Sequence, residues 1–187
     1  MTAPDAELVR ATLAGDLRAF ERLVDRHRDV VLRVAARIVG EDEAEDVAQD
    51  AFLRAYHRLA RWRGDGAFRT WLLQIAHNSA LDTLAARRGE PLPLEEAAYE
   101  LPDAPERTPA ARLEAVERHR RLDVKLKGLS LAHRTVLVLR DVEGLSYDEI
   151  AAVTDTPLGS VKGRLHRARE QFVEALRRNT YDWELPR

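Results

Sequence analysis

Residues 145–169 read LSYDEIAAVTDTPLGSVKGRLHRAR and carry the sharpest structural signal in the chain. Ser146 and Glu149 match the S-x-x-E pattern of a capping box, which predicts that a helix begins there. Thr154-Asp155-Thr156 predicts a turn, and we expect its last residue to cap a second helix that has Pro157 at its first position. A short helix, a three-residue turn and a second helix together predict a helix-turn-helix.

Helical periodicity divides the second of these helices into an apolar face and a basic face. At about 100° per residue, one stripe is predicted to be buried, and it consists of Leu158, Val161, Leu165, Ala168 and Phe172. No acidic residue lies between Ser160 and Arg169. The outward and flanking positions, our candidates for DNA binding, are Ser160, Lys162, Gly163, Arg164, His166, Arg167 and Arg169. The alternative is a solvated basic helix that packs on its neighbours.

Composition limits the class of protein. The 187 residues include 30 Lys and Arg against 32 Asp and Glu, so the net charge is −2 and any nucleic-acid affinity must come from a local surface. The absence of cysteine excludes disulfide scaffolds, thiolate zinc sites and cysteine nucleophiles. No apolar run reaches the roughly 20 residues of a membrane helix, and the first residues do not resemble a signal peptide. We therefore expect a cytoplasmic protein without membrane insertion.

Apolar periodicity predicts an all-α chain of two small helical domains. The first domain is expected over residues 5–88, and the second, which contains the helix-turn-helix, over residues 110–178. Residues 89–109 hold five prolines among acidic side chains, which predicts a flexible acidic linker. Residues 135–139 are β-branched enough for a strand, but no second strand candidate exists, so we expect a helix there too.

Four helices are predicted in the first domain. The second helix follows Gly15 and Asp16, which read as the end of one helix and the cap of the next, and it ends at Gly40. The expected spans are residues 5–14, 17–40, 43–59 and 67–88.

Opposite charges follow each other along the first domain. Glu41 to Asp50 holds six acids and no base, whereas Arg54 to Arg69 holds five arginines and one acid. Helix-dipole complementarity explains much of this asymmetry, but it does not explain the aromatic residues nearby. Aromatic rings that can stack on nucleobases, interleaved with basic side chains that can pair with phosphates, are typical of proteins that bind single-stranded nucleic acid. The candidates are Arg61, Trp62, Arg63, Phe68, Arg69 and Trp71.

Catalytic patterns are not found in the sequence. The six histidines show no metal-ligand spacing, residues 159–163 are not a nucleophile elbow, and no phosphate-binding glycine loop is present. We therefore expect no enzyme, no metal site and no cofactor.

Four segments carry a family resemblance. They read AEDVAQDAFLRAY (44–56), FRTWLLQIAHN (68–78), LVLRDVEGLSYDEIA (137–151) and GSVKGRLHRAR (159–169). Together they resemble the extracytoplasmic-function (ECF, group 4) sigma factors of bacterial RNA polymerase. The resemblance implies that the first domain is sigma region 2, which binds the promoter −10 element, and that the second is sigma region 4, which binds the −35 element.

The resemblance also implies partners. Core RNA polymerase would bind the protein through its flap and through the clamp helices of its largest subunit, which would be contacted by Glu45, Asp46, Gln49 and Asp50. Asn78 and the turn from Arg63 to Phe68 would bind a flipped base of the −10 element of promoter DNA. The family reads the −35 major groove at the positions of Lys162, Gly163, Arg164, His166 and Arg167. An anti-sigma factor is a further expected partner, and the linker would thread through the polymerase.

Two positions depart from the family pattern. Gly163 stands where serine is common, which leaves the centre of the groove-facing surface without a side chain and costs the helix about 1 kcal/mol relative to alanine. Asp155 and Thr156 stand in the turn at the positions where the family usually has a glycine or cysteine together with an apolar residue. Two other functions stay open: a free-standing helix-turn-helix regulator, which would bind duplex DNA alone, and a protein-binding helical adaptor.

Overall fold

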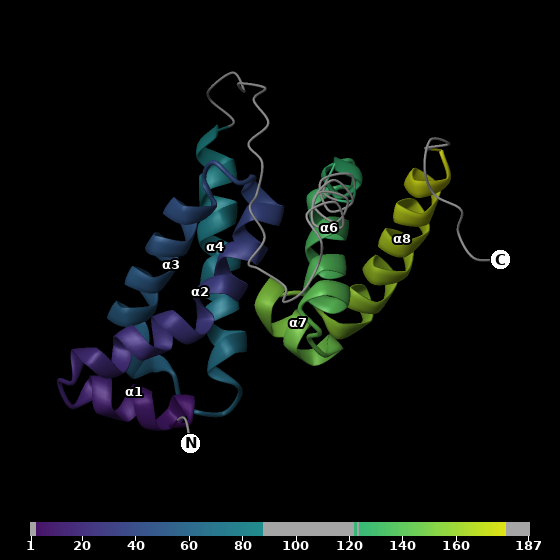
Figure 1. Cartoon of the computed structure of the whole chain (residues 1–187). Helices are drawn as coiled ribbons and strands as arrows, with labels where there is room; N and C mark the ends of the chain where they lie inside the picture. Colours follow the sequence, from purple (N-terminus) through teal and green to yellow (C-terminus); the bar gives the residue numbers. More distant parts are fainter. Residues whose placement is uncertain (1–2, 88–121, 123, 179–187) are drawn as a thin grey trace, which may run out of the picture.

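The computed structural model describes residues 3–87, 122 and 124–178, and every regular element within them is a helix (Figure 1). The elements are α1 (Asp5–Leu13), α2 (Leu17–Val39), α3 (Ala44–Arg58), η1 (Leu59–Arg61), α4 (Phe68–Arg87), α6 (Leu131–Leu137), η2 (Val138–Val142), α7 (Tyr147–Thr154) and α8 (Leu158–Arg177). The predicted all-α class is confirmed. The predicted linker (residues 89–109) lies outside the described residues. So do residues 110–121, at the start of the predicted second domain, and the C-terminal tail from residue 179.

Local chemistry sets the helix boundaries in the first domain. Gly15 follows α1 with a φ of +102°, a conformation that a residue with a side chain rarely adopts. Asp16 then caps α2, because its side chain accepts a hydrogen bond from the Arg18 backbone N–H at 3.0 Å. Gly40, with a φ of +104°, ends α2. These three predictions from sequence are confirmed.

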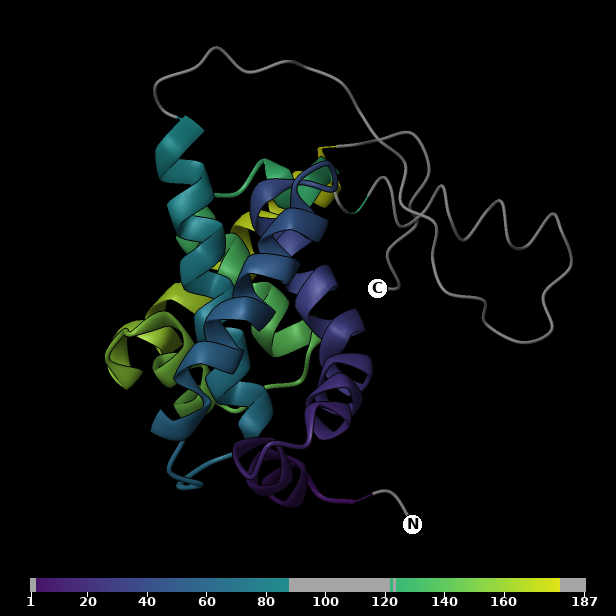
Figure 2. The ribbon, with the colours of Figure 1, turned by 90° about the vertical axis from the view of Figure 1, so that its left-hand side faces the viewer.

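Helices α2, α3 and α4 form the first domain, and α1 lies across one end of them (Figures 1 and 2). Val31, Ala51 and Leu72, one from each of the three long helices, are fully buried where those helices meet. Asp5 attaches α1 to α2 through Arg26 at 2.5 Å and His27 at 3.0 Å. Burial lowers the pKa of His27, an effect that the Asp5 carboxylate opposes.

The second domain is built from α6, η2, α7 and α8. Residues 135–139 are helical, so the strand alternative is excluded, and all five are buried. The helix that starts as α6 widens into the π-helical turn η2, and Glu143 follows directly. Ile150 of α7 and Leu165 of α8 complete the core at 0% and 1% exposure.

The two domains pack against each other, which the sequence did not predict. Helix α4 packs on α7, and α2 packs on α6. The Glu143 side chain is only 2% exposed and pairs with Arg33 at 2.9 Å and Arg69 at 3.0 Å, both from the first domain. The Thr70 hydroxyl donates to Glu149 Oε1 at 2.9 Å. Polar contacts therefore tie the helix-turn-helix to the start of α4.

Candidate nucleic-acid and polymerase interfaces

The helix-turn-helix begins with the predicted capping box. Ser146 Oγ accepts from the Glu149 backbone N–H at 3.2 Å, and Glu149 Oε2 accepts from the Ser146 N–H at 2.8 Å. Helix α7 ends at Asp155, whose φ of +47° lies in the left-handed region. Asp is one of the few residues besides glycine that adopts this region at modest cost, so it can replace the glycine expected from the family pattern.

The predicted role of Thr156 is wrong. Pro157, not Thr156, is the N-cap of α8, and no side chain caps that helix end. The Thr156 hydroxyl donates to the Thr154 carbonyl at 3.1 Å and accepts from Arg164 Nη1 at 3.1 Å. Because its hydroxyl is engaged within the turn and on Arg164, Thr156 holds a candidate DNA-binding side chain instead of the helix terminus.

Helix α8 has a buried apolar stripe on one side and a polar face on the other, as predicted. Val161, Leu165 and Ala168 are at most 1% exposed, and Phe172 packs at the edge of the core. Leu158 was expected in the buried stripe but is 36% exposed, because it lies in the first turn at the end of the helix. Helix α8 packs on α6 and α7, away from the first domain (Figure 1).

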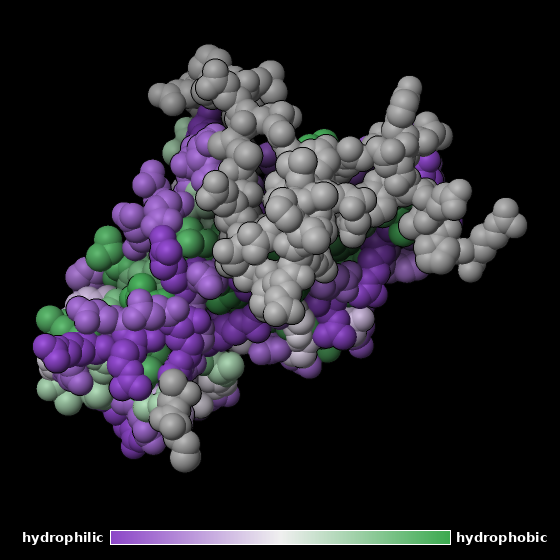
Figure 3. Space-filling model, viewed as in Figure 1, coloured by the Kyte–Doolittle hydropathy of each residue, from purple (hydrophilic) through white to green (hydrophobic). Residues whose placement is uncertain are grey.

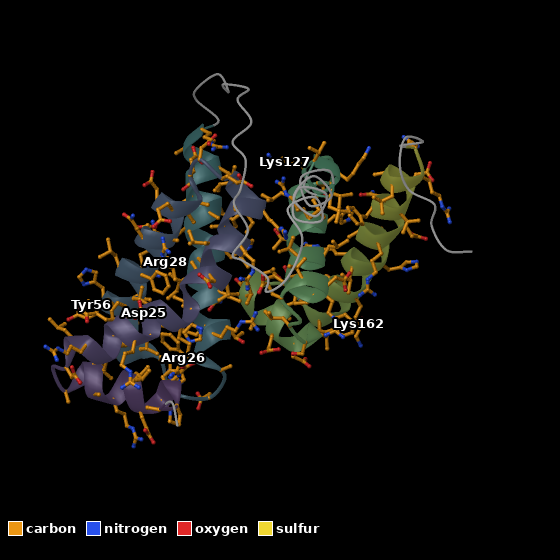
Figure 4. The ribbon with its side chains drawn as sticks, viewed as in Figure 1. Asp25, Arg26, Arg28, Tyr56, Lys127 and Lys162 are labelled. Carbon is orange, nitrogen blue, oxygen red and sulfur yellow. The ribbon has the colours of Figure 1, made fainter. Side chains whose placement is uncertain are left out.

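The candidate residues on α8 differ in how they are held. Ser160, Lys162, His166, Arg167 and Arg169 are exposed, whereas Gly163 and Arg164 are half-buried. Figure 4 labels Lys162 on the outer side of the helix. Arg167 Nε donates to the Gly163 carbonyl at 3.2 Å, and a Cβ at Gly163 would lie 3.6 Å from Arg167 Nη2. The missing side chain therefore leaves the Arg167 guanidinium lying along the helix backbone.

The Arg169 side chain forms an ion pair within its own domain. Its guanidinium binds both oxygens of Asp141 at 3.0 and 2.5 Å. His166 Nε2 lies 3.5 Å from Glu170 Oε1, and both side chains are well exposed. The structure thus leaves Lys162, Arg164 and Arg167 as the cations of the outer face that have no carboxylate partner among the described residues.

The aromatic residues predicted near the −10 strand form one cluster at the start of α4. Phe68 is 3% exposed, with Trp62 packed edge-on at 5.7 Å and Trp71 at 5.6 Å between ring centroids. Both tryptophans are half-buried, while Arg61 and Arg63 are exposed beside them. Only the tryptophan rings offer surface to a base, and Phe68 supports them from below.

Asn78 lies on the same face of α4 as Trp71, because seven residues make nearly two full turns. Its side chain is exposed. The neighbouring His77 is buried, its Nδ1 has no partner among the described residues, and burial lowers its pKa to about 4. His77 faces the core, and Asn78, about 100° further round the helix, faces outward.

The predicted polymerase-contacting residues lie on α3. Glu45, Asp46 and Gln49 are exposed, and Glu45 pairs with Arg28 of α2 at 3.1 Å. Asp50 is half-buried and pairs with Arg54 at 2.8 Å. Figure 4 labels Arg28 where α2 and α3 meet.

An apolar groove that the sequence did not predict lies beside these acids. It runs between α2 and α3 and is lined by Phe20, Val24, Arg28, Glu45, Ala48, Gln49, Phe52 and Leu53. Leu53 is 61% exposed, and Figure 3 shows apolar colour over α2 and α3 among hydrophilic residues. The signal was present in the sequence, since Leu53 falls on the outer face of the predicted helix.

Both domains match known family models. Sigma-70 region 2 matches residues 23–90, and Sigma-70 region 4 matches residues 119–172. This pair of regions in one chain defines a sigma-70-type initiation factor. The RNA polymerase sigma-H factor of Pseudomonas aeruginosa is 39% identical over 184 residues, which cover 92% of this chain and 93% of that protein. The ECF RNA polymerase sigma-E factor of Escherichia coli is 36% identical over 176 residues, 89% and 91% of the two chains.

Solved structures agree with this assignment. CnrH, in a complex with the cytosolic domain of CnrY, superimposes with a TM-score of 0.69 at 34% identity, over 94% of this chain and 99% of that one. The sigma factor RpoE, in a complex with the anti-sigma factor NepR from Bartonella quintana, shares the fold with a TM-score of 0.68 at 21% identity, over 86% and 98% of the chains. The chain belongs to the ECF family of RNA polymerase sigma factors and directs promoter-specific transcription initiation.

None of the helices in the described ranges is long and apolar enough to cross a membrane.

Proposed function

We propose that α8 reads the −35 element in the major groove. The observation that carries this proposal is the exposed, acid-free face of α8 opposite a fully buried stripe. Arg167 would contact a base edge, and Lys162 a phosphate, because Arg167 lies near the centre of the face by its position on the helix and Lys162 lies near the apolar edge. The Thr156 hydroxyl limits the motion of Arg164, which reduces the entropy lost when that side chain meets DNA.

We propose that the start of α4 captures the unpaired −10 strand. Trp62 and Trp71 provide stacking surface, and Arg61 and Arg63 supply charge beside them. Asn78, on the same face as Trp71, presents both a donor and an acceptor to the free edge of an extruded base.

We propose that the groove between α2 and α3 receives the polymerase clamp helices. Its apolar floor can bury side chains of a partner helix, while Asp46 and Gln49 give a polar rim. Glu45 and Asp50 are already paired within the domain, so their contacts would be shared with those arginines. Region 4 would dock on the flap through residues outside its basic face.

We infer that the protein also binds an anti-sigma factor, since RpoE is solved in a complex with the anti-sigma factor NepR. CnrH, which is more similar to this chain in sequence than RpoE is, is likewise solved in a complex, with the cytosolic domain of CnrY. A protein with these roles acts by binding alone, without catalysis or a cofactor, and works in the cytoplasm, where polymerase and chromosome meet.

The test is run-off transcription with core polymerase on a promoter library. Wild-type protein should co-purify with core polymerase and select promoters that share −10 and −35 sequences. Asn78→Ala should keep polymerase binding and closed-complex formation but slow strand opening, and the defect should shrink on a template with a pre-melted −10 bubble. Unchanged opening and −10 preference in Asn78→Ala would remove the base-capture role from this residue.

A further inference from the structure

Asp5, the first residue of α1, is bound by two successive residues of α2. Its Oδ2 lies 3.0 Å from His27 Nε2, and its Oδ1 accepts from Arg26 Nη1 at 2.5 Å. Arg26 Nη2 also donates to the Ala3 carbonyl at 2.8 Å. Because a carboxylate only accepts hydrogen bonds, the hydrogen of the first contact lies on His27 Nε2. Asp5 therefore fixes both the tautomer and the orientation of the imidazole ring.

His27 connects this ion pair to the aromatic cluster at the start of α4. Its ring centroid lies 5.5 Å from that of Phe68, and the two planes are inclined by 49°. The same Phe68 ring contacts Trp62 at 5.7 Å and Trp71 at 5.6 Å. A series of contacts thus runs from the α1 carboxylate, through one buried imidazole and one buried phenyl ring, to both tryptophans.

A histidine is a costly residue at this buried position. The His27 side chain is only 7% exposed, and burial lowers its pKa. An apolar side chain would fill the space without the cost of removing a polar group from water. A hydrogen bond to a carboxylate, however, selects one ring orientation, which an apolar side chain cannot do. The pair therefore suits a positioning role better than a role in stability alone.

Helix α1 also lies beside the turn that carries part of the cluster. It packs on η1, which ends at Arg61, directly before Trp62. Figures 1 and 2 show α1 next to the connection between α3 and α4 in both views, and Figure 4 labels Arg26 beside α1. Helix α1 is thus in contact with the cluster's surroundings from two directions, through η1 and through α2.

We propose that α1 is a positioning element of the −10 site: the Asp5–His27 contact holds Phe68, and through it the two tryptophans, in the arrangement that stacks on an unpaired base. Asp5 and His27 do not touch DNA and act through the ring cluster. The proposal rests on the proposed function of α4 and adds α1 to the elements that capture the −10 strand. Loss of the contact should weaken binding of the unpaired strand and leave the −35 and polymerase contacts intact.

The first test compares two fluorescent DNA probes on reconstituted holoenzyme by anisotropy. Both carry a promoter sequence that wild-type holoenzyme selects. In the first probe the non-template strand continues unpaired through the −10 element, and the second probe ends before that element. Asp5→Ala should lower the affinity for the first probe about tenfold, within the range for loss of one stacked base, and leave the second unchanged.

Two further variants control this comparison. Asp5→Asn should keep most of the affinity for the first probe, because its side-chain carbonyl still accepts from His27 Nε2. Glu7→Ala should have no effect, although it removes an exposed carboxylate from the same first turn of α1. An unchanged affinity of Asp5→Ala for the first probe would overturn the proposal. So would an equal loss on both probes, because α1 would then only stabilise the protein.

A second readout follows the tryptophans directly in the free chain. Trp183→Phe leaves Trp62 and Trp71 as the only tryptophans. In this background, acrylamide should quench the fluorescence of Asp5→Ala more strongly than that of Glu7→Ala, and equal quenching would refute the positioning role. If wild-type holoenzyme gains no affinity from the unpaired strand, the proposed function of α4 is refuted, and the quenching comparison still decides whether α1 positions the tryptophans.

Discussion

The contact between Thr70 and Glu149 provides a sensitive test of how the domains pack. The Glu149 carboxylate accepts two hydrogen bonds. Its Oε2 accepts from the Ser146 backbone N–H at 2.8 Å, which completes the capping box of α7, and its Oε1 accepts from Thr70 Oγ1 of α4 at 2.9 Å. The Ser146 backbone N–H lowers the pKa of Glu149, and the Thr70 hydroxyl adds to this effect. Loss of this side chain therefore removes one contact within the second domain and one contact between domains.

The expected energies follow from the two bonds. Loss of a capping interaction costs about 1 kcal/mol, and loss of a partly exposed hydrogen bond to Thr70 costs about 1 kcal/mol more. Glu149→Ala should thus lower the free energy of unfolding by about 2 kcal/mol, and Thr70→Val by about 1 kcal/mol. In a double-mutant cycle the two should couple by about 1 kcal/mol, because they share one bond.

The pH dependence of this effect has a defined sign. The folded-state pKa of Glu149 lies below its ordinary value of 4.5, so the folded protein binds fewer protons at this group than the unfolded chain. The stabilisation is therefore complete above pH 4.5 and is lost as the pH falls through the folded-state pKa. Wild type and Glu149→Gln should converge in stability in acid.

The assay is urea unfolding of the full chain, followed by circular dichroism at neutral and acid pH. Thr83→Val is the matched control, because the Thr83 hydroxyl donates only to the Ser79 carbonyl of its own helix at 3.1 Å. This control should show no coupling to Glu149. If Thr70 and Glu149 also show none, while Ser146→Ala costs its expected 1 kcal/mol or so, the cap forms but the domains do not pack as described.

Three further predictions concern single residues. Gly163→Ala should raise the free energy of urea unfolding by about 1 kcal/mol, because alanine favours the helix and the new Cβ meets only an ordinary contact at 3.6 Å. Arg167→Ala should cost about 1 to 3 kcal/mol on a cognate −35 element, whereas Lys162→Ala should weaken all sequences alike and make the salt slope shallower by about 0.9, both measured by electrophoretic mobility shift of holoenzyme complexes. His77, with a pKa of about 4, should make the protein lose stability as the pH falls from 6.5 towards 4, and His77→Leu should flatten that part of the stability profile in an acid titration of the unfolding midpoint.

Predictions that depended on neighbouring residues largely succeeded. Gly15, Asp16 and the Ser146–Glu149 capping box act within one helical turn, so their roles do not depend on distant parts of the fold. Thr156 was misassigned for the opposite reason: its hydroxyl bonds to the Thr154 carbonyl and to Arg164, which lies two turns into the following helix, and the residues of the turn alone do not show that contact. Phe68 was assigned to the base-stacking surface, but only the packed cluster shows that the two tryptophans cover it.

The sequence by itself determined the helices, the two domains' family and the acid-free face of α8, because periodicity and capping act over a few residues. Tertiary structure alone decided which charged side chains are paired within the protein and which are left to bind a partner. Arg33 meets Glu143 across 110 residues, and Arg69 meets the same carboxylate across 74. An ion pair of this kind depends on how two separately folded helical surfaces face each other, and no periodicity along the chain encodes that orientation. The same packing turns Arg69 from a free cation beside the aromatic cluster into a partner of the helix-turn-helix domain.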